Sequence, residues 1–410
     1  SNDKRDAKNN LIEKFAFTEP QAEAIVSLQL YRLTNTDITA LQEEAKELGQ
    51  KIKELEEILS NDKKLLKVIK DSLKKVKKTY AGQRRSVIEE KIEEIKINLE
   101  VMVASEDVYV TVTKDGYIKR TSQRSFAASN GQDFGMKDTD RLLCQLEMNT
   151  TDVLLLFTNK GSYVYCPVHQ LPDIRWKDLG QHITNIISID SDESIVKTIP
   201  VREFTESEYL LFFTKNGMAK RTQLMQYKAQ RYSKALVALN LKGDDEVVDV
   251  HVTDGTKDLF IATHSGYGLW FSEDEVSVVG ARAAGVKGVN LKDGDFVASG
   301  QVLEESDVLV LVTQRGSIKR MNRSEFEKTS RAKRGVLMLR ELKKKPHRIT
   351  GLLACSYHAQ ITLQTEKGIT EELLVKDIKL HDRYSNGSFI IDEDEAGEVT
   401  DVWISKHERE

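Results

Sequence analysis

The chain has 410 residues and a formal net charge of −4, from 61 lysines and arginines and 65 acidic residues. It is long enough for two domains, and no apolar run approaches the length of a membrane-spanning helix, which excludes a helical membrane protein. Residues 315–348 hold thirteen basic side chains and three acids, whereas residues 391–410 hold eight acids, one lysine and one arginine. These counts predict a local basic surface and an acidic C-terminal end.

The first hundred residues have the apolar period of helices. Thr18 is a candidate N-cap, because Pro20 follows it in what would be the first helical turn. Between Leu41 and Leu59, apolar residues recur every three or four positions between charged ones, as in the seam of a coiled coil. A lone helix of this kind needs a partner, because propensity alone leaves short helices marginal.

Beyond residue 100 the pattern changes to short strands, and one phrase recurs six times. Each copy has an apolar strand, a glycine turn and a second strand, and the turn glycines lie 45 to 56 residues apart. This period is typical of a propeller, and turn glycines are expected to have positive φ angles. The turn glycines are Gly116, Gly161, Gly217, Gly266, Gly316 and Gly368.

A second recurring phrase gives each unit about four strands. The sequence therefore predicts a mainly β fold, with a helical segment at residues 1–100, a six-bladed β-propeller at 101–404 and an acidic C-terminal end at 391–410. We interpret the acids at 392–395 as solvating the surface, with competition against a polyanion for the basic surface as the alternative.

Three copies end in a basic pair at the same offset from the turn glycine: Lys119-Arg120, Lys220-Arg221 and Lys319-Arg320. One such pair would be a solvated strand end, but its recurrence places equivalent cations around one perimeter. A curved belt of cations suits the backbone of a bent nucleic acid, since phosphate contacts give affinity without reading sequence. Further candidates in the segments that follow are Arg124, Arg231, Lys234, Arg282, Lys287, Arg323, Arg331, Lys333 and Arg334.

The second, fourth and sixth copies lack the basic pair. Tyr165, Trp270 and Glu372 stand where the other copies have arginine. The belt is therefore expected to be uneven, and strongest around the fifth unit. The run at 343–345 reads either as a solvated loop or as an extension of the belt.

Other classes of function have little support in the sequence. The eight histidines show no catalytic spacing, no phosphate-binding GxxxxGK[ST] loop occurs, and the three cysteines lack metal-ligand spacing, which predicts reduced thiols. A protein-interaction propeller of the WD type would carry Gly-His and Trp-Asp pairs, and neither occurs. An enzyme on a propeller would need a polar cluster that the sequence does not show.

The residues also resemble a known family. The phrase EPQAEAIVSLQLYRLT at residues 19–34 closely resembles the exit-gate region of the A subunits of bacterial type IIA topoisomerases. The seam at residues 48–59 and residues 62–85 resemble the end of the coiled-coil arm of those proteins, and the six repeats resemble the DNA-binding β-pinwheel of gyrase and topoisomerase IV. The resemblance implies that the partner of the seam is the incoming helix of the arm, so without it we expect the seam to self-associate, to pack elsewhere or to fray. The resemblance covers almost the whole chain.

One departure separates the two branches of this family. Gyrase A subunits carry a QRRGGKG box after the first repeat, but residues 127–137 here read AASNGQDFGMK, without the basic cluster. The start of the box recurs at residues 83–85, within the helical part, and we interpret it as a coincidence. The missing box favours topoisomerase IV, with a gyrase subunit carrying a degenerate box as the alternative.

The resemblance implies a DNA-binding and DNA-bending domain that engages the transport segment and helps to discriminate DNA topology in ATP-dependent decatenation and relaxation. It implies a cytoplasmic, nucleoid-associated protein whose partner is a B subunit. The parent complex would use Mg²⁺ and ATP, whereas this fragment would need no cofactor. The cleaving tyrosine would lie outside this chain, so the fragment itself is not expected to cleave DNA. The resemblance implies a homodimeric gate at Ala24, Leu28, Leu30 and Leu33.

Overall fold

The computed structural model describes residues 3–28, 35–82, 103–190 and 192–407. The chain divides into two compact parts, an N-terminal helical unit at Ser1–Lys96 and a C-terminal part at Ile97–Glu410. No helix in the described ranges is long and apolar enough to cross a membrane. The last part of the predicted helical segment, including Val87 to Ile95, lies outside the described residues.

The N-terminal unit is helical, as predicted. Thr18 precedes the second helix, and its backbone N–H donates to Oε1 of Gln21 at 2.9 Å, which forms part of a capping box. Leu48, Ile52 and Leu55, which lie on the predicted seam, are all more than half exposed. The helices are α1 (Lys4–Phe15), α2 (Glu19–Val26), α3 (Asn35–Leu59) and α4 (Asp62–Tyr80).

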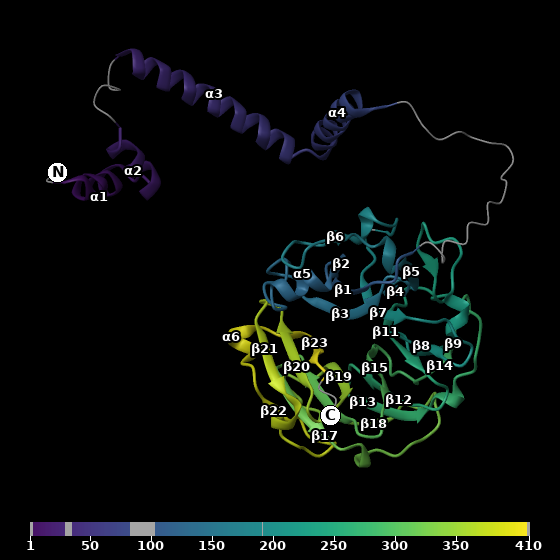
Figure 1. Ribbon diagram of the computed structural model, residues 1–410. Coiled ribbons are helices and arrows are strands. Elements are labelled where there is room, and N and C mark those ends of the chain that lie inside the picture. The colour runs from purple at the N-terminus through teal and green to yellow at the C-terminus, as the bar shows by residue number, and fades with distance from the viewer. Residues whose placement is uncertain (1–2, 29–34, 83–102, 191, 408–410) are drawn as a thin grey trace. The chain divides into compact units, whose positions relative to one another are not determined.

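The C-terminal part of the chain, Ile97–Glu410, is a ring of six antiparallel sheets, which confirms the predicted six-bladed propeller (Figure 1). Its six repeats are numbered as units 1 to 6. In each repeat the first strand lies between the third and the second. From unit 1 to unit 6 the strands are β1 (Asp107–Thr113), β2 (Tyr117–Ser122), β3 (Leu142–Asn149); β4 (Val153–Thr158), β5 (Ser162–Pro167), β7 (Ile195–Val201); β8 (Tyr209–Thr214), β9 (Met218–Gln223), β11 (Val247–Thr253); β12 (Asp258–Thr263), β13 (Tyr267–Ser272), β15 (Val297–Leu303); β16 (Val308–Thr313), β17 (Ser317–Met321), β19 (Ile349–Cys355); and β20 (Gln360–Thr365), β21 (Thr370–Leu374), β23 (Val399–Lys406).

The fourth strand of a sheet comes from the following repeat. Five sheets receive such an outer strand on the free edge of their second strand, whereas the sheet of unit 6 has three strands among the described residues. The outer strands of sheets 1 to 5 are β6 (Gln181–His182), β10 (Leu236–Val237), β14 (Val286–Lys287), β18 (Val336–Leu337) and β22 (Ser388–Phe389).

The turn glycines hold these exchanged strands. Each of the six has a positive φ angle, between 78° and 105°, as predicted. In units 1 to 5 the glycine carbonyl also accepts a backbone N–H from the following repeat, for example from Met338 to Gly266 at 2.8 Å. At Gly368 of unit 6, a Cβ added to the backbone would meet no atom within 4 Å. The strand exchange therefore has an open edge at β21, within the described part of the chain.

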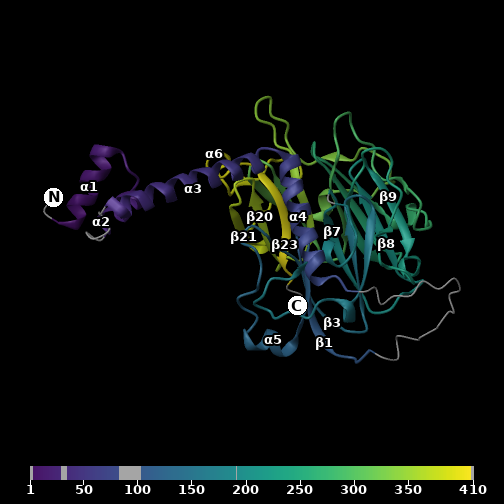
Figure 2. The ribbon, with the colours of Figure 1, turned by 90° about the horizontal axis from the view of Figure 1, so that it is seen from above.

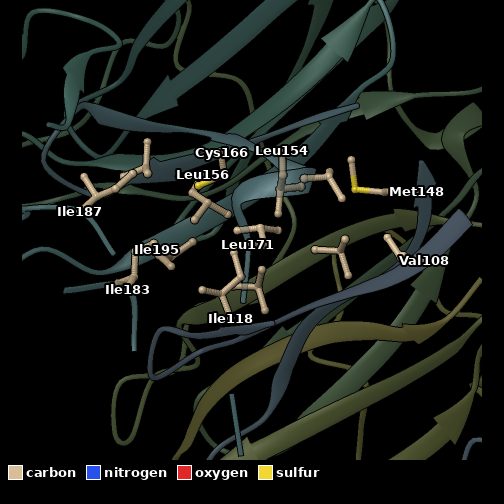
Figure 3. Close-up of a cluster of buried hydrophobic side chains, with 14 residues drawn as sticks. Val108, Ile118, Met148, Leu154, Leu156, Cys166, Leu171, Ile183, Ile187 and Ile195 are labelled. Carbon is tan, nitrogen blue, oxygen red and sulfur yellow. The ribbon is translucent and has the colours of Figure 1, made fainter. Parts of the chain in front are cut away.

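Apolar residues fill the space between consecutive sheets. The first strands are almost continuously apolar because both of their faces are buried, and the third strands contact one another around the axis. Figure 3 shows the cluster between units 1 and 2, which includes Val108 and Ile118 of unit 1 and Leu154 and Leu171 of unit 2. Units 6 and 1 meet through Arg141, whose Nη2 lies 2.6 Å from Oδ2 of Asp401 and whose guanidinium lies over the ring of Trp403.

A charged group joins the third strands of units 2 and 3. Oδ2 of Asp249 lies 2.9 Å from Nε2 of His251, and Oδ1 lies 3.4 Å from Nζ of Lys197. Burial alone would raise the pKa of Asp249, but the charges of His251 and Lys197 hold it well below its ordinary value.

We expect Asp249→Asn to lower the free energy of unfolding by about 2–3 kcal/mol at pH 7, because it leaves Lys197 without its carboxylate. A depressed folded pKa stabilises the protein above the unfolded value of about 3.9, and this contribution disappears as the pH falls through the folded pKa. The difference between variant and wild type should therefore shrink below pH 4. Urea unfolding at pH 7 and pH 3 measures it, and a difference that does not change with pH would contradict the assignment.

Candidate nucleic-acid interface

The three lysines of the basic pairs are inside the protein. Lys119 and Lys220 are 1% exposed and Lys319 is fully buried, so the prediction that they line an exposed belt is wrong. An exchanged strand covers the free edge of each of their strands, and a buried ammonium must find acceptors within the protein.

Backbone carbonyls supply these acceptors at Lys319. Its Nζ donates to the carbonyl of Met338 at 2.5 Å, of Arg383 at 2.6 Å and of Ser385 at 2.7 Å, and it lies 3.3 Å from the carbonyl of Asp382. Met338 follows the outer strand that unit 5 places on sheet 4, whereas the other three belong to unit 6. One ammonium therefore joins two successive repeats.

Lys220 has the same arrangement two units earlier. Its Nζ donates to the carbonyl of Ala238 at 2.7 Å, to the carbonyl of Ala281 and to the hydroxyl of Tyr227 at 3.3 Å. Ala238 belongs to unit 3 and Ala281 to unit 4. Burial lowers the pKa of Lys220 and of Lys319 to about 7. The carbonyls offset part of this desolvation cost, because they accept the N–H bonds that water would otherwise accept.

Lys119 binds the carbonyls of unit 2, at 3.1 Å from Arg175, 2.7 Å from Trp176 and 2.5 Å from Asp178. Its Nζ also lies over the ring of Phe134 of the same unit, 4.4 Å from the ring centroid. Burial lowers the pKa of Lys119 to about 8.

The arginines of the pairs also bind backbone. Arg221 is 8% exposed, whereas Arg120 and Arg320 are half-buried. These three arginines therefore add little exposed charge to the predicted belt. Each guanidinium donates to a backbone carbonyl in the segment that follows the second strand of the next repeat. The bonds are Arg120 to His169 at 2.9 Å, Arg221 to Val276 at 2.8 Å and Arg320 to Ile378 at 3.1 Å.

The segments that these pairs hold form the rim of the disc. In units 2 to 6 each runs from the end of the second strand to the outer strand, so it lies at the edge of a sheet far from the axis, whereas in unit 1 it runs from β2 to the third strand β3. We call them rim segments. Figure 2 shows the propeller turned by 90°, with α5 (Gln123–Ala128) of the first rim segment beside β1. For units 1 to 6 they are residues 123–141, 168–182, 224–237, 273–287, 322–337 and 375–389.

The exposed predicted cations all lie in the rim segments. Seven of them are exposed and have no ion-pair partner among the described residues, and six of these belong to units 3, 4 and 5. They are Arg124, Arg231, Lys234, Arg282, Lys287, Lys333 and Arg334.

Two predicted arginines of unit 5 are half-buried and make structural contacts. Arg331 donates to the carbonyls of Glu275 and Lys287, both at 2.9 Å, and so fastens its rim segment to that of unit 4. Arg323 lies 3.7 Å from Asp258 and over the ring of Trp270. The predicted peak of free charge at unit 5 is thus reduced.

The prediction missed four exposed lysines in the same segments that have no ion-pair partner in the described part of the chain, Lys137, Lys228, Lys376 and Lys379. Lys228 of unit 3 and Lys379 of unit 6 both stand eleven residues after their turn glycine, Gly217 and Gly368. This shared offset is the sequence signal that could have found these two.

The acidic end contacts part of the basic region. Residues 393–396 form α6 (Glu393–Ala396), where Glu393 lies 3.0 Å from Arg315 and Asp394 lies 3.8 Å from Lys345. Lys343 and Lys344 are exposed at the same loop. Part of the charge that the sequence assigned to either solvation or the belt is therefore neutralised within the chain.

The place of the gyrase box is a docked polar loop. Asp133 lies 3.1 Å from Lys177, the ring of Phe134 lies 4.8 Å from that of Trp176, and Gly135 donates its N–H to the carbonyl of Trp176 at 3.0 Å. The loop thus binds unit 2 and presents no basic cluster.

The predicted gate residues are described in part. Ala24 and Leu28 are exposed on the helical unit, whereas Leu30 and Leu33 lie outside the described residues. Residues 83–85 also lie outside. Of the neighbouring residues, Ala22 is buried between α1 and α2, where Lys8 lies 2.7 Å from Glu19.

Comparison with known proteins agrees with this architecture. The family model of the DNA gyrase C-terminal domain, beta-propeller, matches residues 107–132, 152–202, 208–254, 257–304 and 307–356. The family model of the DNA gyrase/topoisomerase IV A subunits matches residues 1–74. The C-terminal part of the chain is therefore a β-propeller of the gyrase C-terminal class.

The relatives specify the family further. The A subunit of DNA topoisomerase 4 from Bacillus subtilis is 76% identical over 98% of this chain and 50% of its own length. The Staphylococcus aureus protein of the same name is 48% identical over 99% of this chain and 51% of its own length. The chain belongs to the family of DNA gyrase and topoisomerase IV A subunits, and it spans about half the length of these curated relatives.

Solved structures place the similarity on the topoisomerase IV side, as predicted. A crystal structure of the C-terminal domain of DNA topoisomerase IV is 65% identical, with a TM-score of 0.72, over 74% of this chain and 94% of that one. The C-terminal domain of DNA gyrase A is 22% identical, with a TM-score of 0.57, over 73% of this chain and 99% of that one, and shares the fold.

Proposed function

We propose that the propeller binds the phosphate backbone of double-stranded DNA along its rim segments. The observation that carries this proposal is the row of exposed cations in units 3 to 5, which have no acidic partner within the described residues. Such cations bind phosphate oxygens, and these contacts give affinity that does not depend on the base sequence.

The chemistry of this contact is positioning by charge. Lysine and arginine side chains at successive points of a curved rim neutralise phosphates along one side of the duplex, which favours a bend toward the protein. Units 3, 4 and 5 contribute Arg231 and Lys234, Arg282 and Lys287, and Lys333 and Arg334. The docked polar loop at residues 127–137 adds no basic cluster, so the expected outcome is a bend without the extended wrapping that a gyrase box supports.

In the parent enzyme, this domain would engage the transport segment and contribute to topology discrimination during ATP-dependent decatenation and relaxation. The helical unit would take part in the homodimeric exit gate, with Ala24 and Leu28 on its exposed surface. The B subunit, Mg²⁺ and ATP would act elsewhere in that complex, which would work in the cytoplasm on the nucleoid. We assign no DNA cleavage to the residues described above.

The dependence of affinity on salt tests this function. The dissociation constant for a linear duplex is measured from 50 to 300 mM salt, and relaxed and supercoiled circles then show which topology is preferred. We expect the logarithm of the association constant to fall with log salt with a slope of about −5 to −6, as for about six phosphate contacts. Binding that does not respond to salt, or no binding at 50 mM, would overturn the proposal.

A further inference from the structure

The buried lysines join the rim segments in pairs. Lys220 binds the carbonyl of Ala238 immediately after the rim segment of unit 3, and the carbonyl of Ala281 within that of unit 4. Lys319 does the same for units 5 and 6, through Met338 and Arg383. Each ammonium lies at the point where the end of one rim segment meets the middle of the next.

The first pair follows the same rule with one change. Lys119 binds the carbonyls of Trp176 and Asp178 in the rim segment of unit 2, and the ring of Phe134 in that of unit 1. A ring face replaces a carbonyl on the side of unit 1, and both present negative charge to the ammonium.

The arginine beside each lysine holds the same next segment at a second point. Arg221 binds the carbonyl of Val276 near the start of the rim segment of unit 4, and Lys220 binds Ala281 five residues later. The outer strand β14 then fixes the end of that segment on β9. The basic pair is therefore a clamp with two attachment points, and lysine is the one that also reaches the preceding segment.

Units 2 and 4 show what replaces the clamp. At the offset of the lysine they have Val164 and Leu269, both nearly fully buried, so these sites contribute packing without a donor for loop carbonyls. The rim segments of units 4 and 5 are joined instead at the surface, through Arg331. A buried ammonium is thus a feature of the odd units and not a general need of the fold.

We propose that Lys220 is a positioning residue of the DNA interface, which holds the rim segments of units 3 and 4 so that their cations contact one stretch of duplex. This inference rests on the proposed function. Arg231 and Lys234 on one segment, and Arg282 and Lys287 on the other, are the side chains that it sets in place. Lys220 itself is 1% exposed, so its ammonium is not on the surface that a phosphate would contact. Any effect of its replacement on DNA binding therefore acts through these loops.

The salt slope measures this role directly. Lys220→Met removes no surface charge, yet we expect the slope to become shallower by about 2, and the dissociation constant at 100 mM salt to rise at least tenfold, because the four cations no longer meet the phosphates together. Leu269→Met at the matched site of unit 4 is the control, with an expected slope equal to that of wild type. Hydrogen exchange should rise in residues 224–237 and 273–287 of Lys220→Met and stay unchanged in 168–182.

Three outcomes separate positioning from structure and from the function itself. A folded Lys220→Met variant with the wild-type slope would overturn the inference, because loss of stability alone changes the active fraction and not the slope. If that variant does not fold by circular dichroism, Lys220→Gln is measured in its place. Its amide nitrogen ends one bond short of the lysine Nζ, so it cannot hold the carbonyls of Ala238 and Ala281 together, and an unchanged slope again overturns the inference. A wild-type protein without salt-dependent binding would instead refute the proposed function and leave the contacts of Lys220 as they are.

Discussion

Lys319→Met is expected to lower the free energy of unfolding of the propeller by about 3 kcal/mol. Its ammonium donates to three buried or half-buried carbonyls, those of Met338, Arg383 and Ser385, and lies 3.3 Å from the carbonyl of Asp382. Replacing a buried ion by an apolar residue is often neutral when its partners are replaced too, but here the carbonyls remain and lose their donor. The loss of these bonds exceeds the gain from no longer burying a charge.

The pH dependence of this effect has a definite sign. The pKa of Lys319 is about 7 in the folded protein, and an unfolded lysine has a pKa of about 10.4. Between these values the unfolded chain binds the additional proton, so the stability of the wild type rises with pH. The variant lacks this rise, and its destabilisation should therefore be larger at pH 9 than at pH 6.

Urea unfolding at both pH values, followed by tryptophan fluorescence and circular dichroism, measures the effect. Leu269→Met occupies the same offset in unit 4, where Leu269 is 2% exposed. It should change stability by less than about 1.5 kcal/mol, as volume-conserving apolar replacements do. If Lys319→Met were as stable as this control at pH 9, the carbonyl contacts would not be a stabilising element.

The sequence predicted those features that depend on local patterns. The six turn glycines revealed the repeat, since a tight turn with positive φ leaves its mark at one residue, and the apolar strands beside them gave the number of blades. The helix start at Thr18 was equally local. The absence of a basic cluster at residues 127–137 was readable in the same way, and it gave the correct branch of the family.

The exposure of the basic pairs could not be read in this way. Strand β2 is buried on both faces, so Ile118 and Lys119 are both inside although they point in opposite directions. The carbonyls that satisfy Lys119 lie more than fifty residues later in the chain. Alternation along one strand contains no information about such a distant segment, and a lysine at a strand end reads as solvated by default.

The strand exchange explains why the prediction was still useful. Each basic pair holds the rim segment of the following unit, and the exposed predicted cations also lie in rim segments, those of units 1, 3, 4 and 5. The sequence therefore identified the correct part of the surface through residues that do not lie on it. Arg282 and Lys287 of unit 4 were found in this way, although unit 4 has no basic pair of its own.

Reversing the charge of Arg231, Lys234, Arg282 and Lys287 to glutamate is expected to weaken DNA binding by about a thousandfold at 50 mM salt and to make the salt slope shallower by about 3 to 4. All four side chains are exposed, and none has an ion-pair partner in the described residues, so no structural contact of this kind is lost. Competition binding to a linear duplex across salt concentrations measures both quantities.

The matched control reverses Lys67, Lys70, Lys75 and Lys78 of α4, which are exposed on the helical unit. It changes the net charge by the same amount, so an equal loss of affinity would show that total charge, and not the rim, determines binding. Adding Lys220→Met to the rim variant provides a further check. If the lysine acts only by positioning these four cations, it should cause no additional loss of affinity once they are reversed, because changes that act through the same contacts are not additive. A full additional loss would mean that Lys220 supports DNA binding through another part of the propeller.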